Sequence, residues 1–190
     1  MFVYADNAAT TKMSRTAIDA MLPYMETTFG NPSSLYSIGQ EAKEALTDAR
    51  ERAAKCLGCL PREIIFTSGG SEADNQAIIS AARIGAKKGK KHLISTTFEH
   101  HAVLHTLKKL EKEGFEVTYL DVHHDGLVTA DEVRAAIRPD TCLVTIMFAN
   151  NEIGTIEPIA EIGAVCKEQN VLFHPMPCRQ RGMSILTSKP

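Results

Sequence analysis

The sequence lacks any apolar run long enough to cross a membrane, and it also lacks a strong excess of charge. A membrane-spanning helix needs about 18 or more apolar residues in succession, and no stretch of this chain reaches that length. Lysine and arginine number 21 and aspartate and glutamate 23, and the one basic stretch, residues 87–91, is typical of a solvated helix end. We therefore expect neither a membrane nor a nucleic acid as a partner.

The chain also lacks a recognisable secretory signal and a pattern of paired cysteines. Its first residues, MFVYADNAATT, carry an acid and no basic segment ahead of the apolar residues, unlike a signal peptide. The five cysteines are an odd number and are scattered, so a reduced, cytoplasmic setting is the expectation. Cys56 and Cys59 have the spacing of a redox or zinc pair, but they lie at a predicted helix end without a second pair, and we interpret them as incidental.

What the chain does contain is a regular alternation of strand-like and helix-like segments. Its 190 residues, 44% of them hydrophobic, are enough for one domain with a core. Apolar runs and periodicity predict strands over 62–66, 92–95, 116–120, 142–147 and 171–173, and helices over 14–25, 35–57, 72–85, 102–112, 130–137 and 159–168. This order predicts the α/β class, as a three-layer α/β/α domain with a mostly parallel sheet. The predicted domains are an N-terminal arm (1–14), the main domain (15–174) and a separate tail (175–190).

The segment FTSGGSE at residues 66–72 is the strongest local signal. A predicted strand leads into Gly69 and Gly70, then Ser71, and a helix begins. Backbone N–H groups at a helix N-terminus suit a phosphate, and glycines let the backbone approach it closely. The alternative is a tight turn capped by Ser71. The segment has neither the Lys-Ser/Thr of a Walker A loop nor the G-x-G-x-x-G of dinucleotide folds.

Polar residues also follow two other predicted strands. His100 comes after the strand at 92–95, and ligands bind at the carboxyl ends of parallel strands, so this imidazole could stack on an aromatic cofactor or move protons; a helix cap is the alternative. Asn151 follows the strand at 142–147 and could hydrogen-bond a ring hydroxyl or a carboxylate. His123 and His124 lie in a turn without a third ligand at useful spacing, and we interpret them as structural.

Five segments in this order resemble the cysteine desulfurases. They are DNAATT (6–11), FGNPSS (29–34), FTSGGSE (66–72), Glu-His (99–100) and NNEIG (150–154). These enzymes belong to aminotransferase class V, have the fold-type I large domain and use pyridoxal 5'-phosphate, and the branch resembled serves nitrogen fixation and iron–sulfur cluster assembly. The resemblance covers residues 1–174. It implies conversion of L-cysteine to L-alanine with an enzyme persulfide, a homodimer, and an iron–sulfur scaffold protein as partner.

The resemblance also implies roles for single residues. Gly70 and Ser71 would bind the cofactor phosphate. His100 would stack on the pyridine ring and act as a catalytic proton carrier, and Asn151 would bond near the phenolic oxygen of the ring. Ala8 and the loop at Asn31 would lie toward the substrate.

The resemblance breaks in the tail. After His174 the family has a small residue and then Asp-Ala-x-Gln, whereas this chain has Met176 at the Asp position and Arg179 at the Gln position. Back-translated with permitted codons and read one base earlier, residues 175–190 become xDAVQAAGHVHIDVKA, which is the family's continuation. We therefore interpret the tail as the product of a frameshift, in the genome or in its sequencing.

A frameshift at this point has consequences for activity. In the family, the lysine that binds the cofactor covalently and the cysteine that accepts sulfur both lie downstream, so covalent attachment of the cofactor is not expected and the truncated chain is predicted to be inactive. Two alternatives stay open. One is a selenocysteine lyase or another class V pyridoxal enzyme, and the other is a non-catalytic fragment that binds an intact homologue.

Overall fold

The computed structural model describes residues 3–7 and 9–176. Two compact units make up the chain, one formed by residues up to Phe66 and the other beginning at Thr67. Ala8 and nearly all of the predicted tail, including Arg179, lie outside the described residues. In the described ranges, no helix combines the length and the apolar character of a membrane span.

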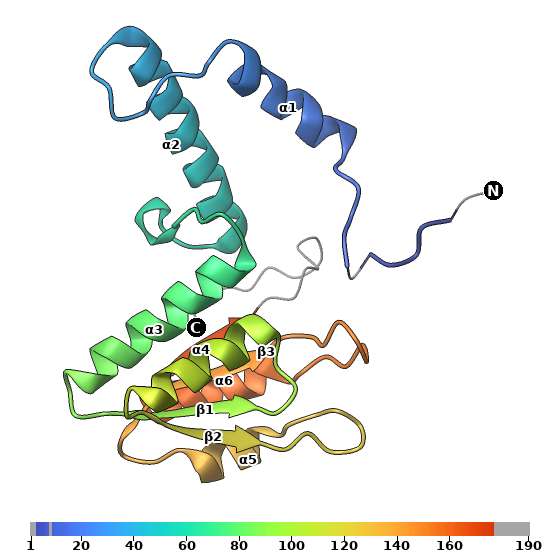
Figure 1. Ribbon diagram of the computed structural model, residues 1–190, viewed down its shortest axis with the longest axis vertical. Coiled ribbons are helices and arrows are strands. Elements are labelled where there is room, and N and C mark those ends of the chain that lie inside the picture. Colours follow the sequence, from blue (N-terminus) through green and yellow to red (C-terminus); the bar gives the residue numbers. More distant parts are fainter. Residues whose placement is uncertain (1–2, 8, 177–190) are drawn as a thin grey trace. The chain divides into compact units, whose positions relative to one another are not determined.

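The second unit is a parallel sheet with helices on both faces (Figure 1). The strands lie in the order β2-β1-β3-β4, and every pairing is parallel. The elements of this unit, in chain order, are α3 (Gly70–Ala86), β1 (His92–Thr96), α4 (His101–Lys112), β2 (Glu116–Leu120), α5 (Ala130–Ala136), β3 (Thr141–Met147), α6 (Ile159–Glu168) and β4 (Leu172–Met176). The predicted α/β class and three-layer arrangement are confirmed.

The central strands are apolar on both sides because each side faces a helical layer. Leu93 and Leu143 are fully or almost fully buried in a cluster with residues of α3 and α4, whereas their neighbours Ile94 and Val144 are buried in a second cluster with residues of α5 and α6. Successive strand residues point to opposite faces, so a run without alternation is what a doubly covered strand requires. Each such side chain contributes roughly 1.5–3 kcal/mol by burial.

The strand β4 runs past the point where we predicted the tail to begin. It continues through Pro175, opposite Ile146, to Met176, opposite Met147, and the Met176 carbonyl accepts a hydrogen bond of 2.9 Å from the Phe148 N–H. Ladder hydrogen bonds use the backbone and tolerate changes of side chain, and proline is accepted on the last strand of a sheet, where one side has no partner. Among the described residues, β4 is such an edge strand.

The close packing of α3 on β3 depends on the absence of a side chain at Gly85. A Cβ atom there would lie 2.4 Å from the Cβ of Cys142, well inside contact distance, so we expect Gly85→Ala to lower the free energy of unfolding by about 1–3 kcal/mol. Gly163 in α6 is the matched control, since a Cβ there meets nothing closer than Phe173 at 3.5 Å. Gly163→Ala should keep or raise stability by up to about 1 kcal/mol. Urea unfolding of both variants measures this, and equal effects would contradict the packing argument.

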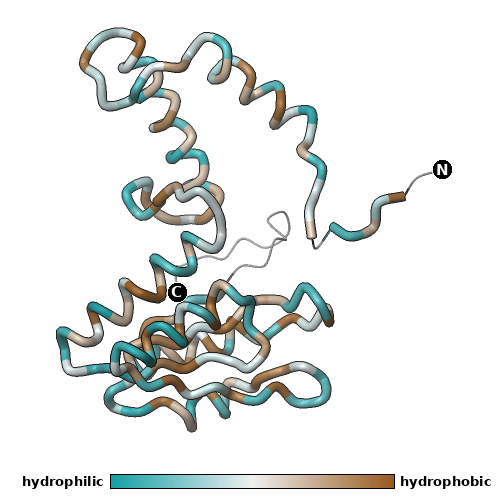
Figure 2. The backbone as a smooth tube through the Cα atoms, viewed as in Figure 1, coloured by the Kyte–Doolittle hydropathy of each residue, from teal (hydrophilic) through white to brown (hydrophobic). Residues whose placement is uncertain are grey.

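The first unit is helical. It comprises α1 (Arg15–Glu26), α2 (Ser37–Leu57) and the short 3-10 helix η1 (Pro61–Glu63). Ser14 caps α1 by accepting a hydrogen bond of 3.1 Å from the Ala17 N–H, in agreement with the predicted start. α2 ends at Leu57 and is followed by Gly58, which has a left-handed φ of 67°, a conformation that favours glycine. None of the residues of α1 is buried, and its apolar residues are visible as brown segments in Figure 2.

The prediction of a strand over residues 62–66 is wrong. Residues 61–63 form η1, and no described strand pairs with residues 64–66. Ile65 is 69% exposed and Phe66 50% exposed, while Arg50 lies over the Phe66 ring at 4.9 Å and donates to the Ile64 carbonyl. An apolar β-rich run becomes a strand only where a neighbour supplies the ladder, which sequence periodicity cannot reveal.

Candidate functional site

The candidate site lies in the second unit, at the carboxyl edge of the sheet. The loops that follow β1 and β3 meet there: Asn150, after β3, donates a hydrogen bond of 3.2 Å from Nδ2 to the carbonyl of Phe98, after β1. The N-terminal part of α3 reaches the same edge, since Asp74 in this helix lies 3.7 Å from His174 on β4. The structure therefore brings together the segments that carry Gly70, Ser71, His100 and Asn151. This is the edge at which parallel sheets bind ligands.

The first turn of α3 has no side-chain cap. Its N-cap is Gly69, and a Cβ placed on Gly69 or Gly70 would meet nothing within 4 Å. Ser71 is exposed and is not the cap, so the alternative of a turn capped by Ser71 is wrong. Instead, Glu72 reaches back and accepts hydrogen bonds from the N–H and hydroxyl of Ser68 at 2.7 and 2.6 Å. The result is an open set of backbone donors at the positive end of a helix dipole.

A buried acid, Asp74, and a half-buried histidine, His174, lie just behind this turn. Asp74 is 6% exposed, and its Oδ1 lies 3.7 Å from Nε2 of His174 on β4. The Nδ1 of His174 is 2.9 Å from the hydroxyl of Thr145 on β3. Burial raises the pKa of Asp74, while the imidazole of His100 lowers it; burial lowers the pKa of His174. These contacts tie the start of α3 to the ends of β3 and β4.

His100 is half-buried and caps α4. Its Nδ1 accepts a hydrogen bond of 3.1 Å from the Ala102 N–H, so the capping role that we considered as the alternative is present. This bond uses Nδ1 and fixes the orientation of the ring, and it leaves Nε2 for another partner.

Glu99, the residue before His100, ties the ends of two strands together. It is 4% exposed, and its Oε1 accepts hydrogen bonds from the Met147 N–H at 2.8 Å and the Thr96 hydroxyl at 2.9 Å. Its Oε2 has no partner among the described residues. Burial raises the pKa of Glu99 to about 7, and the charges of Glu157 and Asp74 add to the rise.

The two adjacent asparagines after β3 have different roles. Asn150 is 8% exposed, and besides its bond to the β1 loop its Oδ1 accepts from the N–H groups of Glu152 and Ile153 at 2.8 and 3.1 Å. It therefore shapes the turn. Asn151 is exposed, so its amide is open to solvent.

Sequence reasoning did not single out Asp74 or Glu99 as site residues. A signal for Asp74 was present: it has helical spacing with Ile78, Ala82 and Gly85, which form the buried face of α3. An acid on an apolar helix face is costly unless it is paired. For Glu99, the only indication in the sequence was its position just after a predicted strand.

The other residues considered as metal or redox ligands lie outside this candidate site. His123 pairs with Glu132 at 2.6 Å, and this contact raises the pKa of His123 and helps to lower that of Glu132 to about 2, where the larger causes are hydrogen bonds from Thr129. Cys56 and Cys59 are free thiols in the first unit. Within the described residues, no three His, Cys, Asp or Glu side chains are arranged to hold a metal ion.

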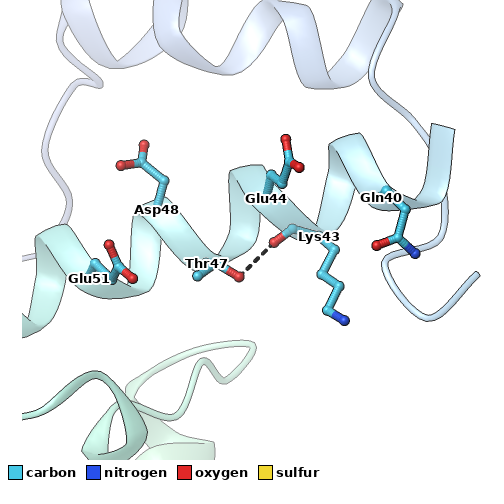
Figure 3. A pocket seen from close by; sticks show the side chains of 6 residues that line it. All are labelled: Gln40, Lys43, Glu44, Thr47, Asp48 and Glu51. Carbon is cyan, nitrogen blue, oxygen red and sulfur yellow. Dashed lines mark hydrogen bonds between the residues drawn. The ribbon is translucent and has the colours of Figure 1, made fainter. Parts of the chain in front are cut away.

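The first unit carries a polar groove and the Asn31 loop. The groove is lined by six side chains of α2 alone, as Figure 3 shows: Gln40, Lys43, Glu44, Thr47, Asp48 and Glu51. A groove formed by one face of a single helix lacks the convergent walls of a small-molecule site. Asn31 stabilises its own loop by accepting a hydrogen bond of 2.9 Å from the Ser33 N–H.

Comparison with known proteins gives a consistent result. Residues 3–175 match the family model of aminotransferase class V. The chain is 56% identical over 172 residues to "Cysteine desulfurase IscS" of Methanosarcina thermophila, which covers 90% of this chain and 42% of that protein. It is 49% identical over 172 residues to "Putative cysteine desulfurase IscS 1" of Bacillus subtilis strain 168, with 90% and 45% covered. The chain thus spans less than half the length of these relatives.

Solved structures agree with the sequence matches. A "NIFS-LIKE PROTEIN" superposes with a TM-score of 0.88 at 40% identity, covering 92% of this chain and 48% of the other. "SspA in complex with cysteine" superposes with a TM-score of 0.86 at 42% identity, covering 90% and 49%.

Proposed function

Because the chain belongs to the aminotransferase class V family, we propose that it is the N-terminal part of a pyridoxal-phosphate-dependent cysteine desulfurase. The observation that carries the proposal is the open N-terminus of α3, where two unhindered glycines adjoin the pair of buried Asp74 and half-buried His174 at the carboxyl edge of the sheet. The relatives named above are cysteine desulfurases by name, which favours this member of the family over a selenocysteine lyase.

The described residues fit the phosphate and one ring face of the cofactor. The first-turn N–H groups at Gly70 and Ser71 would bind the phosphate, His100 would lie against the ring, and the exposed amide of Asn151 would bond near its phenolic oxygen. When bound, this cofactor supplies an electron sink for bond cleavage at an amino-acid substrate. His100 would carry a proton at Nε2, because its Nδ1 is engaged by the Ala102 N–H.

The described residues do not fit the ring nitrogen. The resemblance places an aspartate at position 176 to hold that nitrogen protonated, but Met176 is there, 7% exposed and packed in the cluster with Leu143 and Met147. A thioether carries no charge to pair with a pyridinium. The family match ends at residue 175, next to this substitution. Both observations support a frameshifted tail and an inactive chain, and no reaction step is assigned to it.

Substrate and partners follow from the same proposal. We infer L-cysteine as the substrate of the intact enzyme, and a structural neighbour is described in complex with cysteine. The intact enzyme would form a homodimer in the cytoplasm, leave sulfur as a persulfide on one of its own cysteines, release L-alanine and pass the sulfur to an iron–sulfur scaffold protein.

The phosphate site can be tested with pyridoxamine 5'-phosphate, which lacks the aldehyde that reacts with surface lysines. We expect it to bind the chain at least about tenfold more tightly than pyridoxamine does, because the phosphate provides most of the contacts. Gly70→Asp should remove this preference by adding a negative charge where the phosphate sits. Isothermal titration calorimetry measures both affinities.

The matched control is Ser80→Asp, which adds the same charge to an exposed position further along α3. It should leave the preference for the phosphorylated ligand unchanged. Equal affinities of the two ligands for the unmodified chain would reject the assignment of Gly70 and Ser71.

A further inference from the structure

Two histidines lie one helical turn apart on the exposed side of α4. His101 and His105 are both exposed, their ring centroids are 5.8 Å apart, and the ring planes differ by 25°. Residues at positions i and i+4 share one face of a helix. The two imidazoles therefore face the same volume of solvent.

In the described part of the chain, neither the His101 nor the His105 side chain makes a hydrogen bond, although the His101 ring also lies 6.3 Å from the ring of His100, tilted by 52°. The other histidines with side-chain contacts are committed: His92 to Thr141 and Thr118, His100 to Ala102, His123 to Glu132, and His174 to Thr145. A metal ion binds a neutral imidazole nitrogen through its lone pair. His101 and His105 can each offer one such nitrogen without breaking a described hydrogen bond.

The spacing of the two rings is close to that of a metal-bound pair. Two imidazoles bound to one Zn²⁺ at about 2.0–2.1 Å per nitrogen, near the tetrahedral angle, have ring centroids about 5 Å apart. The observed 5.8 Å therefore requires only small side-chain rotations. Because α4 fixes both Cα atoms, its backbone need not change.

We propose that His101 and His105 form a two-histidine site for a late first-row divalent metal ion such as Zn²⁺, separate from the phosphate site. Imidazole nitrogens select such ions over Mg²⁺ and Ca²⁺, which prefer oxygen ligands. Water or a further donor fills the remaining positions, since both rings lie at the surface. Lys108 and the positive end of α4 oppose a dication, so the affinity is moderate.

Calorimetric titration of the untagged chain with Zn²⁺ tests the proposal. We expect one ion per chain, and His101→Gln and His105→Gln should each weaken binding by about tenfold or more, because a single imidazole cannot chelate. Both positions are exposed, so folding should be preserved, and circular dichroism of each variant checks this. His124→Gln removes another exposed histidine and should leave binding unchanged.

Thiols are the competing zinc ligands in this chain. Cys56→Ser and Cys59→Ser should leave the affinity unchanged, and Co²⁺ bound in place of Zn²⁺ should show ligand-field bands without the thiolate charge-transfer absorption. Loss of binding in a cysteine variant, binding retained in both histidine variants, or no binding at all would overturn the proposal.

Discussion

A gene carrying one extra base at codon 175 is expected to produce a protein that converts L-cysteine to L-alanine, whereas the 190-residue chain is expected to form none. The extra base returns Asp in place of Met176 and Gln in place of Arg179. An aspartate at the ring nitrogen makes the cofactor an effective electron sink. The rate of alanine formation is measured with each protein purified in the presence of pyridoxal phosphate. We expect no detectable turnover for the 190-residue chain and the turnover of an ordinary enzyme for the protein with the extra base.

A second variant of the gene distinguishes the effect of the aspartate from that of the rest of the restored chain. The same extra base combined with a methionine codon at position 176 should give a full-length protein that still binds pyridoxal phosphate covalently but has little activity. Resequencing the locus around codon 175 determines whether the base is missing from the genome. Alanine formation by the 190-residue chain would contradict its predicted inactivity, and a stop codon soon after the junction in the shifted frame would contradict the frameshift.

Replacing Glu99 by glutamine is expected to remove a pH dependence of stability in the second unit. Burial raises the pKa of Glu99 from its ordinary 4.5 to about 7, so between these values the folded chain holds a proton that the unfolded chain has lost. The free energy of unfolding therefore falls as the pH rises from about 4.5 to about 7, by roughly 3 kcal/mol in total. Above about pH 7 Glu99 is ionised in the folded chain, and the whole destabilisation from burying its charge is present.

Glutamine cannot ionise, and its oxygen can still accept from the Met147 N–H and the Thr96 hydroxyl. Glu99→Gln should therefore match the parent chain near pH 5 and exceed its stability by up to about 3 kcal/mol near pH 8. Urea unfolding at the two pH values measures the difference. The control Glu152→Gln changes an exposed carboxylate and should alter stability little at either pH.

A glutamine variant that is no more stable at pH 8 than at pH 5, relative to the parent chain, would show that Glu99 is ionised without penalty. Its unpartnered Oε2 would then have a donor that the described contacts do not include. Glu99→Ala provides an independent check, since it removes the acceptor for two buried donors and should destabilise the chain by several kcal/mol at both pH values.

Much of the secondary structure of the second unit could be predicted from the local sequence pattern. The predicted helix over 159–168 and strand over 116–120 agree with α6 and β2 residue for residue, and the other helices of this unit begin or end within two residues of prediction. These segments have strong periodicity and buried faces, so local preference and tertiary packing agree. The family resemblance drawn from five motifs is likewise confirmed by the match of residues 3–175.

The sequence by itself therefore determined the fold class, the family and the order of the elements, because hydrophobic period and short motifs are properties of neighbouring residues. Tertiary structure alone decided which segment gained a strand partner, so that 62–66 did not form a strand while β4 continued to Met176. It also decided that Asn150 is buried in its turn while Asn151 is exposed, and that Glu99 and Asp74 are buried. Burial and pairing depend on residues distant in the chain, whose positions only the folded structure supplies.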